Sequence, residues 1–252
     1  MELQQYYPDD RIRIIQRNNG KYQVIVNTDY SQEEIEQEIN QIKKEAIANG
    51  TFMKAPNGKP TNLTERQWLQ VRTKAFKDWF GDWINDPANA SKVVDENGEP
   101  LVVYRGTRSD STVYNTGQFR SKTIFGTQKK VGASRYGKPI ALFMNIKNPA
   151  MLDYKGKEYN VRVEDEFYTP GLGFTALDRK AHRAVEMGYD GMIVKNVKDG
   201  TDYPIDDYIT TNSNQIKSAT DNVGTFSREN NNIYENRDKA ISILSIINNV
   251  EK

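Results

Sequence analysis

The chain has 252 residues, and its 35 Lys and Arg residues nearly balance its 34 Asp and Glu residues, for a formal net charge of +1 at pH 7. This balance argues against a generic polyanion binder, although local patches remain possible. With no cysteine and a single histidine, the chain can form no disulfide, no thiolate or multi-histidine metal site and no cysteine nucleophile, and we expect no metal cofactor.

The N-terminal part predicts a small hairpin-and-helix region. Residues 11–26 carry two β-prone runs around Asn18-Asn19-Gly20, which is a tight-turn signal. Ser31 and Glu34 then form a capping box, and the helix that they open should end near Asn49-Gly50. The apolar stripe of this helix consists of Ile35, Ile39, Ile42 and Ala46.

A second capping box, made by Thr64 and Gln67, predicts a helix that runs toward Asn85. All three tryptophans of the chain lie in this segment, together with several other apolar residues. We expect the tryptophans to anchor a core rather than to stack on nucleic-acid bases. Asp86-Pro87 should end the helix, because the residue before a proline disfavours the helical conformation.

The apolar run Leu101–Tyr104 leads directly into Arg105, Gly106 and Thr107. Such a run suits a strand that is buried on both faces. Gly106 lets the backbone turn and lets a ligand come close. An arginine at the end of a core strand suits a phosphate or carboxylate ligand, and an arginine that simply reaches solvent is the alternative.

A basic segment follows, since no acidic residue lies between Asp110 and Asp153. Its seven basic residues are Arg120, Lys122, Lys129, Lys130, Arg135, Lys138 and Lys147. A segment of one charge sign suits an anionic ligand, and an exposed basic loop is the alternative. Within it, residues 123–127 predict a short strand and residues 131–136 a helical turn.

Further short elements complete the chain. We expect strands at 139–146, 190–194 and 208–211, a loop-and-strand excursion at 154–163, an aspartate-rich loop at 201–207 and an amphipathic helix at 237–250. Asp178 should cap a helix that ends at Gly188, and we take His182 on this helix as a surface or packing residue. Short strands mixed with helices, without regular alternation, indicate an α+β fold.

We expect three parts along the chain. A proline-bounded loop at 56–60 separates an N-terminal accessory region, residues 1–60, from the main domain, residues 61–235. A polar stretch that ends near Glu235 precedes the C-terminal helix, residues 236–252.

Five segments, taken together, carry a family resemblance: Phe76–Trp83, Val93–Gly106, Asn145–Pro149, Asp190–Ile193 and Asn214–Ala219. They resemble the ADP-ribosyltransferase domain of polyvalent proteins from phages and mobile elements. That family belongs with the poly(ADP-ribose) polymerases and the ADP-ribosylating toxins. The resemblance covers about residues 64–235, and it implies a split mixed β-sheet core with flanking helices, a pocket for NAD as substrate, and no metal.

The resemblance implies a role for each matching position. Arg105 occupies the first catalytic-strand position, usually histidine, and would anchor NAD. Phe125 and Tyr136 would hold the nicotinamide ring between two aromatic faces. Asp207 stands 8 residues before Gln215, where polymerase-like relatives place the catalytic glutamate. Its carboxylate would stabilise the positive charge that develops on the ribose.

The backbone of Gly106 would hold the nicotinamide amide, and Thr127 would offer a nearby hydroxyl. We therefore expect the catalytic residues to be Asp207, Arg105 and Phe125. We expect NAD to be bound by Arg105, Gly106, Thr107, Phe125, Thr127, Tyr136 and Gln215.

The chain departs from the family pattern at two further positions. Asp207 is one methylene shorter than the usual glutamate, and Ala133 stands where polymerase-like relatives often have serine. Asp206 is adjacent, and a shift of one residue would exchange the two aspartates. Neighbours on a strand point to opposite faces, so only one of them can face the ligand.

We expect a NAD-dependent mono-ADP-ribosyltransferase that modifies a host protein or nucleic acid as an effector of a phage or mobile element. A catalytically weak or dead NAD-binding or interaction module of the same fold is one alternative. A nucleic-acid-binding protein that uses the basic residues 120–138 is another. Without a long apolar run or a signal peptide, we expect no membrane partner. We expect a cytoplasmic protein, made in or delivered into a bacterial host cell.

Overall fold

A computed structural model describes residues 12–16, 22–26, 30–108, 123–161, 163, 165–167, 176–228 and 230–234. Its helices are α1 (Gln32–Ala48), α2 (Glu65–Gln70), α3 (Lys74–Phe80), α4 (Lys130–Ser134) and α5 (Ala176–Glu186). Its strands are β1 (Ile12–Gln16), β2 (Tyr22–Val26), β3 (Val103–Thr107), β4 (Ile124–Thr127), β5 (Lys138–Met144), β6 (Pro149–Asp153), β7 (Gly191–Val197), β8 (Ile205–Thr210) and β9 (Ile216–Ser218). The expected helix at 237–250 and the basic residues Arg120 and Lys122 lie outside the described residues.

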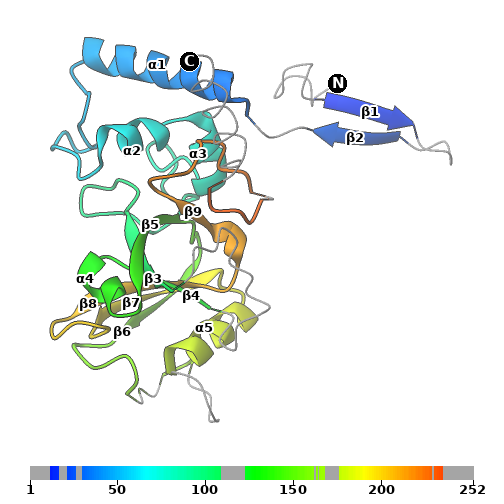
Figure 1. Cartoon of the computed structure of the whole chain (residues 1–252). Helices are drawn as coiled ribbons and strands as arrows, with labels where there is room; N and C mark the ends of the chain where they lie inside the picture. The colour runs from blue at the N-terminus through cyan, green and yellow to red at the C-terminus, as the bar shows by residue number, and fades with distance from the viewer. Residues whose placement is uncertain are drawn as a thin grey trace, which may run out of the picture.

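The main sheet has seven strands in the order β6-β7-β8-β4-β3-β5-β9. β6 and β7 run parallel, whereas the other neighbouring strands pair antiparallel. The sheet is therefore mixed, and with its flanking helices it confirms the expected α+β fold. β1 and β2 form a separate antiparallel pair, as the hairpin prediction requires. In Figure 1, α1 lies across α2 and α3 at one end, and the seven-stranded sheet lies below them.

The sheet is split between β3 and β4. β3 pairs with β5 at five consecutive positions, but with β4 it pairs only at Tyr104 and Thr127. α4 fits against β3 beyond this rung, because Gly106 has no side chain there. A Cβ on Gly106 would lie 2.1 Å from the carbonyl oxygen of Ala133. The close approach of α4 thus requires glycine at this position, and it occurs where the two strands separate.

The tryptophan-rich segment forms two short helices instead of the one helix that we expected. Thr73 separates them: its hydroxyl donates to the Gln70 carbonyl at 2.8 Å and accepts from the Phe76 N–H at 3.3 Å. It therefore caps the start of α3. α3 ends at Gly81, whose φ of 101° and contact with Ala90 both exclude a Cβ.

The tryptophans anchor a core, as predicted. Trp68, Trp79 and Trp83 are buried in one cluster that also contains Phe143 of β5 and Phe226. Each indole N–H donates to a backbone carbonyl, at 2.9, 2.9 and 3.0 Å respectively. Burial therefore leaves none of these three donors unsatisfied.

α1 packs on the same cluster. Ala46 is a buried member, and Ile39 and Ile42 are half-buried against it. The predicted capping box of Ser31 and Glu34 starts the helix, and Asn49 caps its end. At its N-terminal end, Ile35 is 3% exposed. The helix thus places its predicted apolar stripe on the core that the tryptophans form.

A buried ion pair ties the helices to the turn before β3. Arg72 lies between α2 and α3 and donates to Glu99 at 2.7 Å, and the Glu99 side chain is fully buried. The guanidinium also lies 3.7 Å from the centre of the Trp68 ring. The turn of residues 95–100, which precedes β3, is thereby held against the tryptophan cluster.

Several strand boundaries differ from the prediction. β3 begins at Val103 rather than Leu101, so Arg105 lies inside the strand and not at its end. β6 begins at Pro149, where we expected no strand. β8 begins at Ile205, so Asp206 and Asp207 lie on a strand rather than in the expected loop.

The expected caps and the helix signals also need one correction. Asp178 is the third residue of α5 rather than its N-cap, because the helix begins at Ala176. Its carboxylate accepts a hydrogen bond from the Thr123 hydroxyl at the start of β4.

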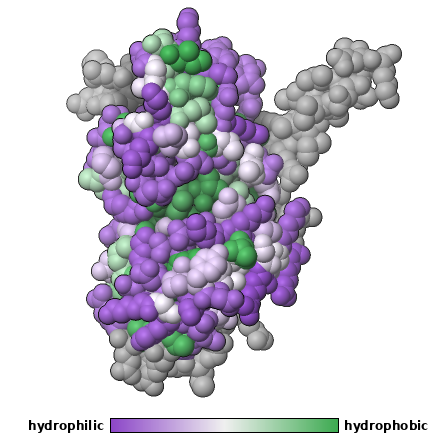
Figure 2. All heavy atoms as spheres, turned by 90° about the vertical axis from the view of Figure 1, so that its left-hand side faces the viewer, coloured by the Kyte–Doolittle hydropathy of each residue, from purple (hydrophilic) through white to green (hydrophobic). Residues whose placement is uncertain are grey.

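In the described ranges, no helix has both the length and the apolar character that a membrane crossing requires. The face turned to the viewer in Figure 2 is largely hydrophilic.

Candidate active site

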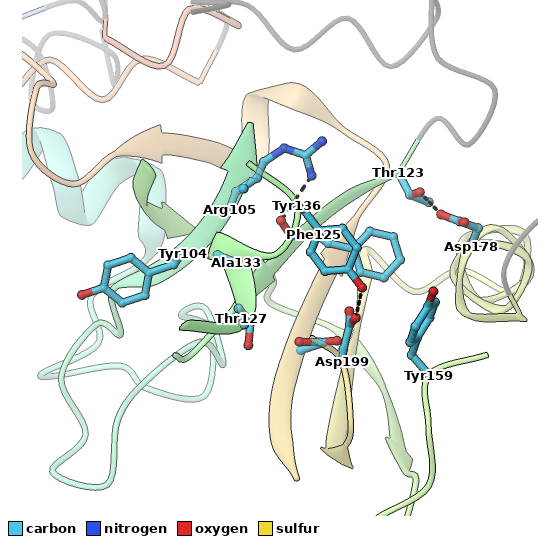
Figure 3. Close-up of a pocket in the computed structure, with 14 residues that line it drawn as sticks. Tyr104, Arg105, Thr123, Phe125, Thr127, Ala133, Tyr136, Tyr159, Asp178 and Asp199 are labelled. Atoms are coloured by element: carbon cyan, nitrogen blue, oxygen red, sulfur yellow. Dashed lines mark hydrogen bonds between the residues drawn. The ribbon is translucent and has the colours of Figure 1, made fainter. Parts of the chain in front are cut away.

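A pocket of about 240 Å³ opens where β3 and β4 separate. β3, β4, the α4 region and β8 all contribute to its wall (Figure 3). Six of the predicted site residues line it: Arg105, Gly106, Phe125, Thr127, Tyr136 and Asp207. These positions are scattered over a hundred residues of sequence, and the fold brings them to a single cavity.

The alternation of side chains along β4 and β8 explains this convergence. Phe125 and Thr127 are two residues apart on β4 and therefore share one face of the sheet. Thr127 stands directly opposite Asp207 of β8 in the antiparallel register. Opposite residues point to the same face, so all three side chains are directed to the side that α4 covers. Their placement follows from strand pairing rather than from loop conformation.

Asp207 is the deepest acidic group of the pocket, with 1% of its surface exposed. Its Oδ2 atom has no hydrogen-bond partner among the described residues. Burial raises the pKa of this carboxyl well above its ordinary value of 3.8. The neighbouring Asp199 carboxyl raises that pKa further, while the Thr127 hydroxyl acts in the opposite direction. The site therefore favours the neutral form of Asp207.

Asp206 lies on the other face of β8. Its carboxylate accepts from Lys195 Nζ at 2.6 Å and from the backbone N–H of Asn196 at 3.1 Å. Of the two adjacent aspartates, only Asp207 lines the cavity. We predicted that only one of the two aspartates could face the ligand. The alternation of side chains along β8 directs Asp207 to the pocket and Asp206 to Lys195.

Arg105 lines the pocket from β3, and its guanidinium donates to the Phe125 carbonyl at 3.3 Å. This bond spans the opening between β3 and β4, and Figure 3 shows the guanidinium extending over it. The planar guanidinium of an arginine is suited to a phosphate or carboxylate. Arg105 is therefore placed to hold an anionic group at this side of the pocket.

The backbone of Gly106 is directed into the opening. Gly106 stands opposite Pro139 in the register of β3 and β5, and proline has no N–H to donate. Gly106 and Pro139 therefore form a non-hydrogen-bonded pair, and the backbone hydrogen bonds between β3 and β5 are made by the pairs on either side of it. In such a pair the N–H and C=O of Gly106 point away from β5, toward β4. If the pairing of β3 and β4 continued from Tyr104 and Thr127, Phe125 would stand opposite Gly106. The two strands are not paired at this position.

Tyr136 is 40% exposed, and its hydroxyl donates to the Asp199 carboxylate. Burial and the adjacent Asp199 both raise the pKa of Tyr136, so the phenol stays neutral. Asp199 follows β7, and a Cβ on the next residue, Gly200, would lie 2.7 Å from the Gly132 carbonyl. The loop after β7 and α4 thus meet backbone to backbone at the edge of the pocket.

Eight lining residues were not predicted as site residues: Gly126, Gly132 and Ala133, and five with polar side chains, Tyr104, Thr123, Tyr159, Asp178 and Asp199. Thr123 and Asp178 bond to each other although 55 residues separate them. No local pattern marks these residues, because each reaches the pocket through tertiary packing. A single signal was present for Asp199, since Asp-Gly marks a turn between two strands.

Two predicted NAD-binding residues lie elsewhere. The Gln215 amide donates to the carbonyls of Asn145 and Asp190, at 2.7 and 2.9 Å, and accepts from the Thr210 hydroxyl. It joins the ends of three strands behind the sheet and does not line the pocket. Thr107, one residue beyond Gly106, is also absent from the lining and stands opposite Lys138 of β5. The strand alternation directs it away from the face that Gly106 and Asp207 share.

Within the described part of the chain, no group of three or more His, Cys, Asp or Glu side chains is arranged to hold a metal ion. The pocket instead combines the guanidinium of Arg105, four aromatic rings and three carboxyl groups, those of Asp178, Asp199 and Asp207. Such a lining can hold an anion, a flat ring and a developing positive charge in one place.

Comparison with known proteins identifies one family. A family model described as "ADP-Ribosyltransferase in polyvalent proteins" matches residues 95–226, which is more than half of the 252-residue chain. No curated protein and no solved structure matches the chain significantly. The matched residues include every residue that lines the pocket.

Proposed function

The chain belongs to the family of ADP-ribosyltransferases in polyvalent proteins, and from this membership we propose that it transfers ADP-ribose from NAD to a macromolecular acceptor. Members of this family use NAD as their substrate. The observation that carries the proposal is the convergence of Arg105, Phe125, Tyr136 and Asp207 on one pocket at the split of the sheet. The acceptor that we propose is a host protein or nucleic acid, modified by an effector of a phage or mobile element.

The pocket fits one part of NAD better than the whole molecule. Its volume of about 240 Å³ is below the roughly 300–1,000 Å³ of sites that enclose drug-sized ligands. We therefore assign the cavity to the nicotinamide and its ribose. Gly106 supports this assignment, because its N–H and C=O point into the opening and can bond the nicotinamide amide.

Arg105 anchors the substrate in this proposal. Its guanidinium crosses the opening, and a planar fork of donors matches a phosphate oxygen pair. Phe125 and Tyr136 present aromatic surface to the same cavity. A flat, positively charged ring such as nicotinamide is favoured by both stacking and cation–π attraction at such surfaces.

Asp207 is the group that we propose for charge stabilisation. Cleavage of the bond between nicotinamide and ribose leaves positive charge on the ribose, and a nearby carboxylate stabilises that charge. The Oδ2 atom of Asp207 has no hydrogen-bond partner among the described residues, and Asp207 lines the cavity. Thr127 stands opposite Asp207 on β4, and its hydroxyl lowers the pKa of this carboxyl.

The experiment that tests the proposal compares two adjacent carboxylates. We expect the purified protein to release nicotinamide from NAD and to label an acceptor, and we expect Asp207→Asn to lose both activities. Asp206→Asn is the matched control, because Asp206 lies on the opposite face and bonds Lys195. Equal activity of the wild type and Asp207→Asn would remove Asp207 from the mechanism.

A second candidate function is an NAD-binding module that carries out slow chemistry or none. The observation that favours it is the raised pKa of Asp207, because a neutral carboxyl cannot stabilise a cation. Aspartate also reaches less far than the usual glutamate, and a misplacement of about 1 Å can cost ~100-fold in rate. Calorimetric NAD binding without any nicotinamide release would select this function.

A further inference from the structure

Asp199 has no part in the mechanism above, yet it lines the same pocket as Asp207. We propose that Asp199 is a positioning residue of this site: it shares a single proton with Asp207, and the two carboxyl groups together carry one negative charge until a cationic ring enters the pocket. The first half of the proposal concerns the protein alone. The second half, the response to a ligand, rests on the proposed function.

The geometry around Asp199 supports a charged carboxylate there. Tyr136 donates its hydroxyl to Asp199 Oδ1, and a phenol donor favours the ionised form of its acceptor. Asp199 is half-buried at the rim, whereas Asp207 is 1% exposed at the bottom of the cavity. A negative charge costs less at the rim than at the bottom, so the shared proton resides on Asp207.

Asp207 can reach Asp199 as a donor. Both side chains line the same pocket, and the Asp199 carboxyl raises the pKa of Asp207 through its charge and as a hydrogen-bonding neighbour. Figure 3 shows the Asp199 carboxylate below the Tyr136 hydroxyl, which donates to it. A protonated Asp207 that donates to Asp199 uses the one arrangement in which two adjacent buried carboxyl groups attract rather than repel.

Other charged and titratable groups surround the pair, and the charge of Asp206 also raises the pKa of Asp207. Asp206 is on the opposite face of β8 and is paired with Lys195. Asp178 of α5 accepts from Thr123 at the far wall, and Arg105 of β3 bonds the Phe125 carbonyl. The remaining titratable groups that line the pocket are the phenols Tyr104, Tyr136 and Tyr159.

A cation in the pocket changes the balance of the pair. The nicotinamide ring of NAD is positively charged, and a positive charge beside two carboxyl groups favours ionisation of both. Binding therefore expels the shared proton to solvent and turns Asp207 into the carboxylate that the reaction needs. The pair would in this way delay full ionisation of Asp207 until the substrate is in place.

Carbon-13 NMR titration of the aspartate carboxyl groups in the full-length chain tests the pair without any ligand. We expect one resonance to titrate well above the ordinary aspartate range and to be missing in Asp207→Asn. In Asp199→Asn the titration midpoint of this resonance should shift to lower pH, because an amide donor replaces the second carboxylate. Asp202→Asn is the matched control in the same loop. In this variant the midpoint of the Asp207 resonance should equal that of the wild type.

Tyr136→Phe provides a second variant in case Asp199→Asn does not fold. Asp199 then loses the hydrogen-bond donor that favours its charge, so the titration midpoint of the Asp207 resonance should shift to higher pH. The proposal is overturned if Asp207 titrates in the ordinary range in the wild type. It is also overturned if neither Asp199→Asn nor Tyr136→Phe moves the midpoint.

Calorimetry of NAD binding in two buffers of different ionisation heat tests the response to the ligand. We expect the wild type, below the midpoint found by NMR, to release about one proton for each NAD bound, and Asp199→Asn to release fewer. Equal proton release in both proteins contradicts the inference while leaving the proposed function intact. Absence of NAD binding contradicts the proposed function, and the NMR titration then decides the proton-sharing pair by itself.

Discussion

Gly106 determines the shape of the site by having no side chain. A Cβ there would lie 2.1 Å from the Ala133 carbonyl and 2.8 Å from the Tyr136 Cβ. Both contacts belong to the α4 region, so a methyl group would push α4 away from β3. The same residue directs its backbone into the opening. From the sequence we explained this glycine by a turn of the backbone and the close approach of a ligand. The structure adds a second reason, because α4 packs directly against it.

We predict that Gly106→Ala weakens NAD binding and lowers the free energy of unfolding by about 1–3 kcal/mol, the usual cost of overpacking. The neighbouring atom is a backbone oxygen, which cannot move without shifting α4. Gly58→Ala is the control, because nothing lies within 4 Å of that position and its cost is limited to local backbone strain. Urea denaturation and NAD calorimetry measure the two effects. A variant that binds NAD like the wild type would show that α4 is free to move.

The raised pKa of Asp207 predicts a pH-dependent cost to stability. The folded protein holds this proton more tightly than the unfolded chain does, so the contribution of Asp207 is favourable at low pH. It is lost as the pH rises from the ordinary value of 3.8 through the folded-state pKa. Above that pKa, each unit of upward shift corresponds to about 1.4 kcal/mol.

Asp207→Asn should therefore be more stable than the wild type at neutral pH, and the difference should shrink as the pH falls. Urea denaturation at several pH values measures it. Asp206→Asn should have the opposite effect at neutral pH, because Lys195 loses its partner. A wild type that is as stable as Asp207→Asn at every pH would contradict the raised pKa. The prediction describes a site that gives up stability for function.

The site residues differ in how far the sequence could identify them. Arg105 was indicated by its local sequence, and the family resemblance implied Phe125, Tyr136 and Asp207; all four line the pocket. Gln215 was misassigned, because spacing along the chain does not reveal that its amide joins strand ends. Asp199 was missed for a related reason, since its role depends on a neighbour that only strand pairing brings near.

At the scale of elements, Thr73 shows why a helix pattern can hide a break. Trp68, Phe76 and Trp79 keep an apolar face through both α2 and α3, and this favours one continuous helix. The hydroxyl of Thr73 instead bonds the end of one helix and the start of the next. Threonine is a good cap and a weak helix former, but the packing of the tryptophan cluster makes the choice.

We predict that Thr73→Ala destabilises the protein by about 1–2 kcal/mol through the loss of this cap. Thr73→Ser keeps the hydroxyl and should retain most of the stability. Chemical denaturation followed by tryptophan fluorescence measures both, because all three indoles lie in the affected cluster. If the serine variant is as unstable as the alanine variant, the methyl group rather than the hydroxyl is responsible.

The strand boundaries were harder to predict than the strands themselves. Aspartate is disfavoured in strands, and this hid the start of β8 at Asp206 and Asp207. Each carboxylate is compensated by tertiary structure, one by Lys195 and the other by the pocket. β6 was missed because a proline begins it, which is acceptable at an edge strand such as this one.

At the scale of the whole molecule, the tryptophan cluster extends beyond the segment that defines the family. The family match begins at residue 95, whereas Trp68, Trp79 and Trp83 precede it. These residues pack against Phe143 and Phe226, which lie inside the match. The apolar stripe of α1 covers the same cluster. The matched segment therefore shares its core with the residues before it.

We predict that a chain starting at residue 61 is markedly less stable than a chain starting at residue 30. Both retain the segment 95–226 and every residue of the pocket. The shorter chain lacks α1, so the tryptophan cluster becomes exposed and the chain tends to aggregate. Thermal unfolding and light scattering compare the two. Equal melting temperatures would show that α1 contributes little to the core.

The single rung between β3 and β4 also bears on how this architecture changes in evolution. β3 and β4 separate beyond this rung, so exchanging a lining side chain alters the chemistry of the opening while the split in the sheet remains. Histidine can give way to arginine, and glutamate to aspartate, in a cavity that keeps its form. A lineage built on such a scaffold can lose turnover, recover it, or acquire a new acceptor while its architecture is inherited intact.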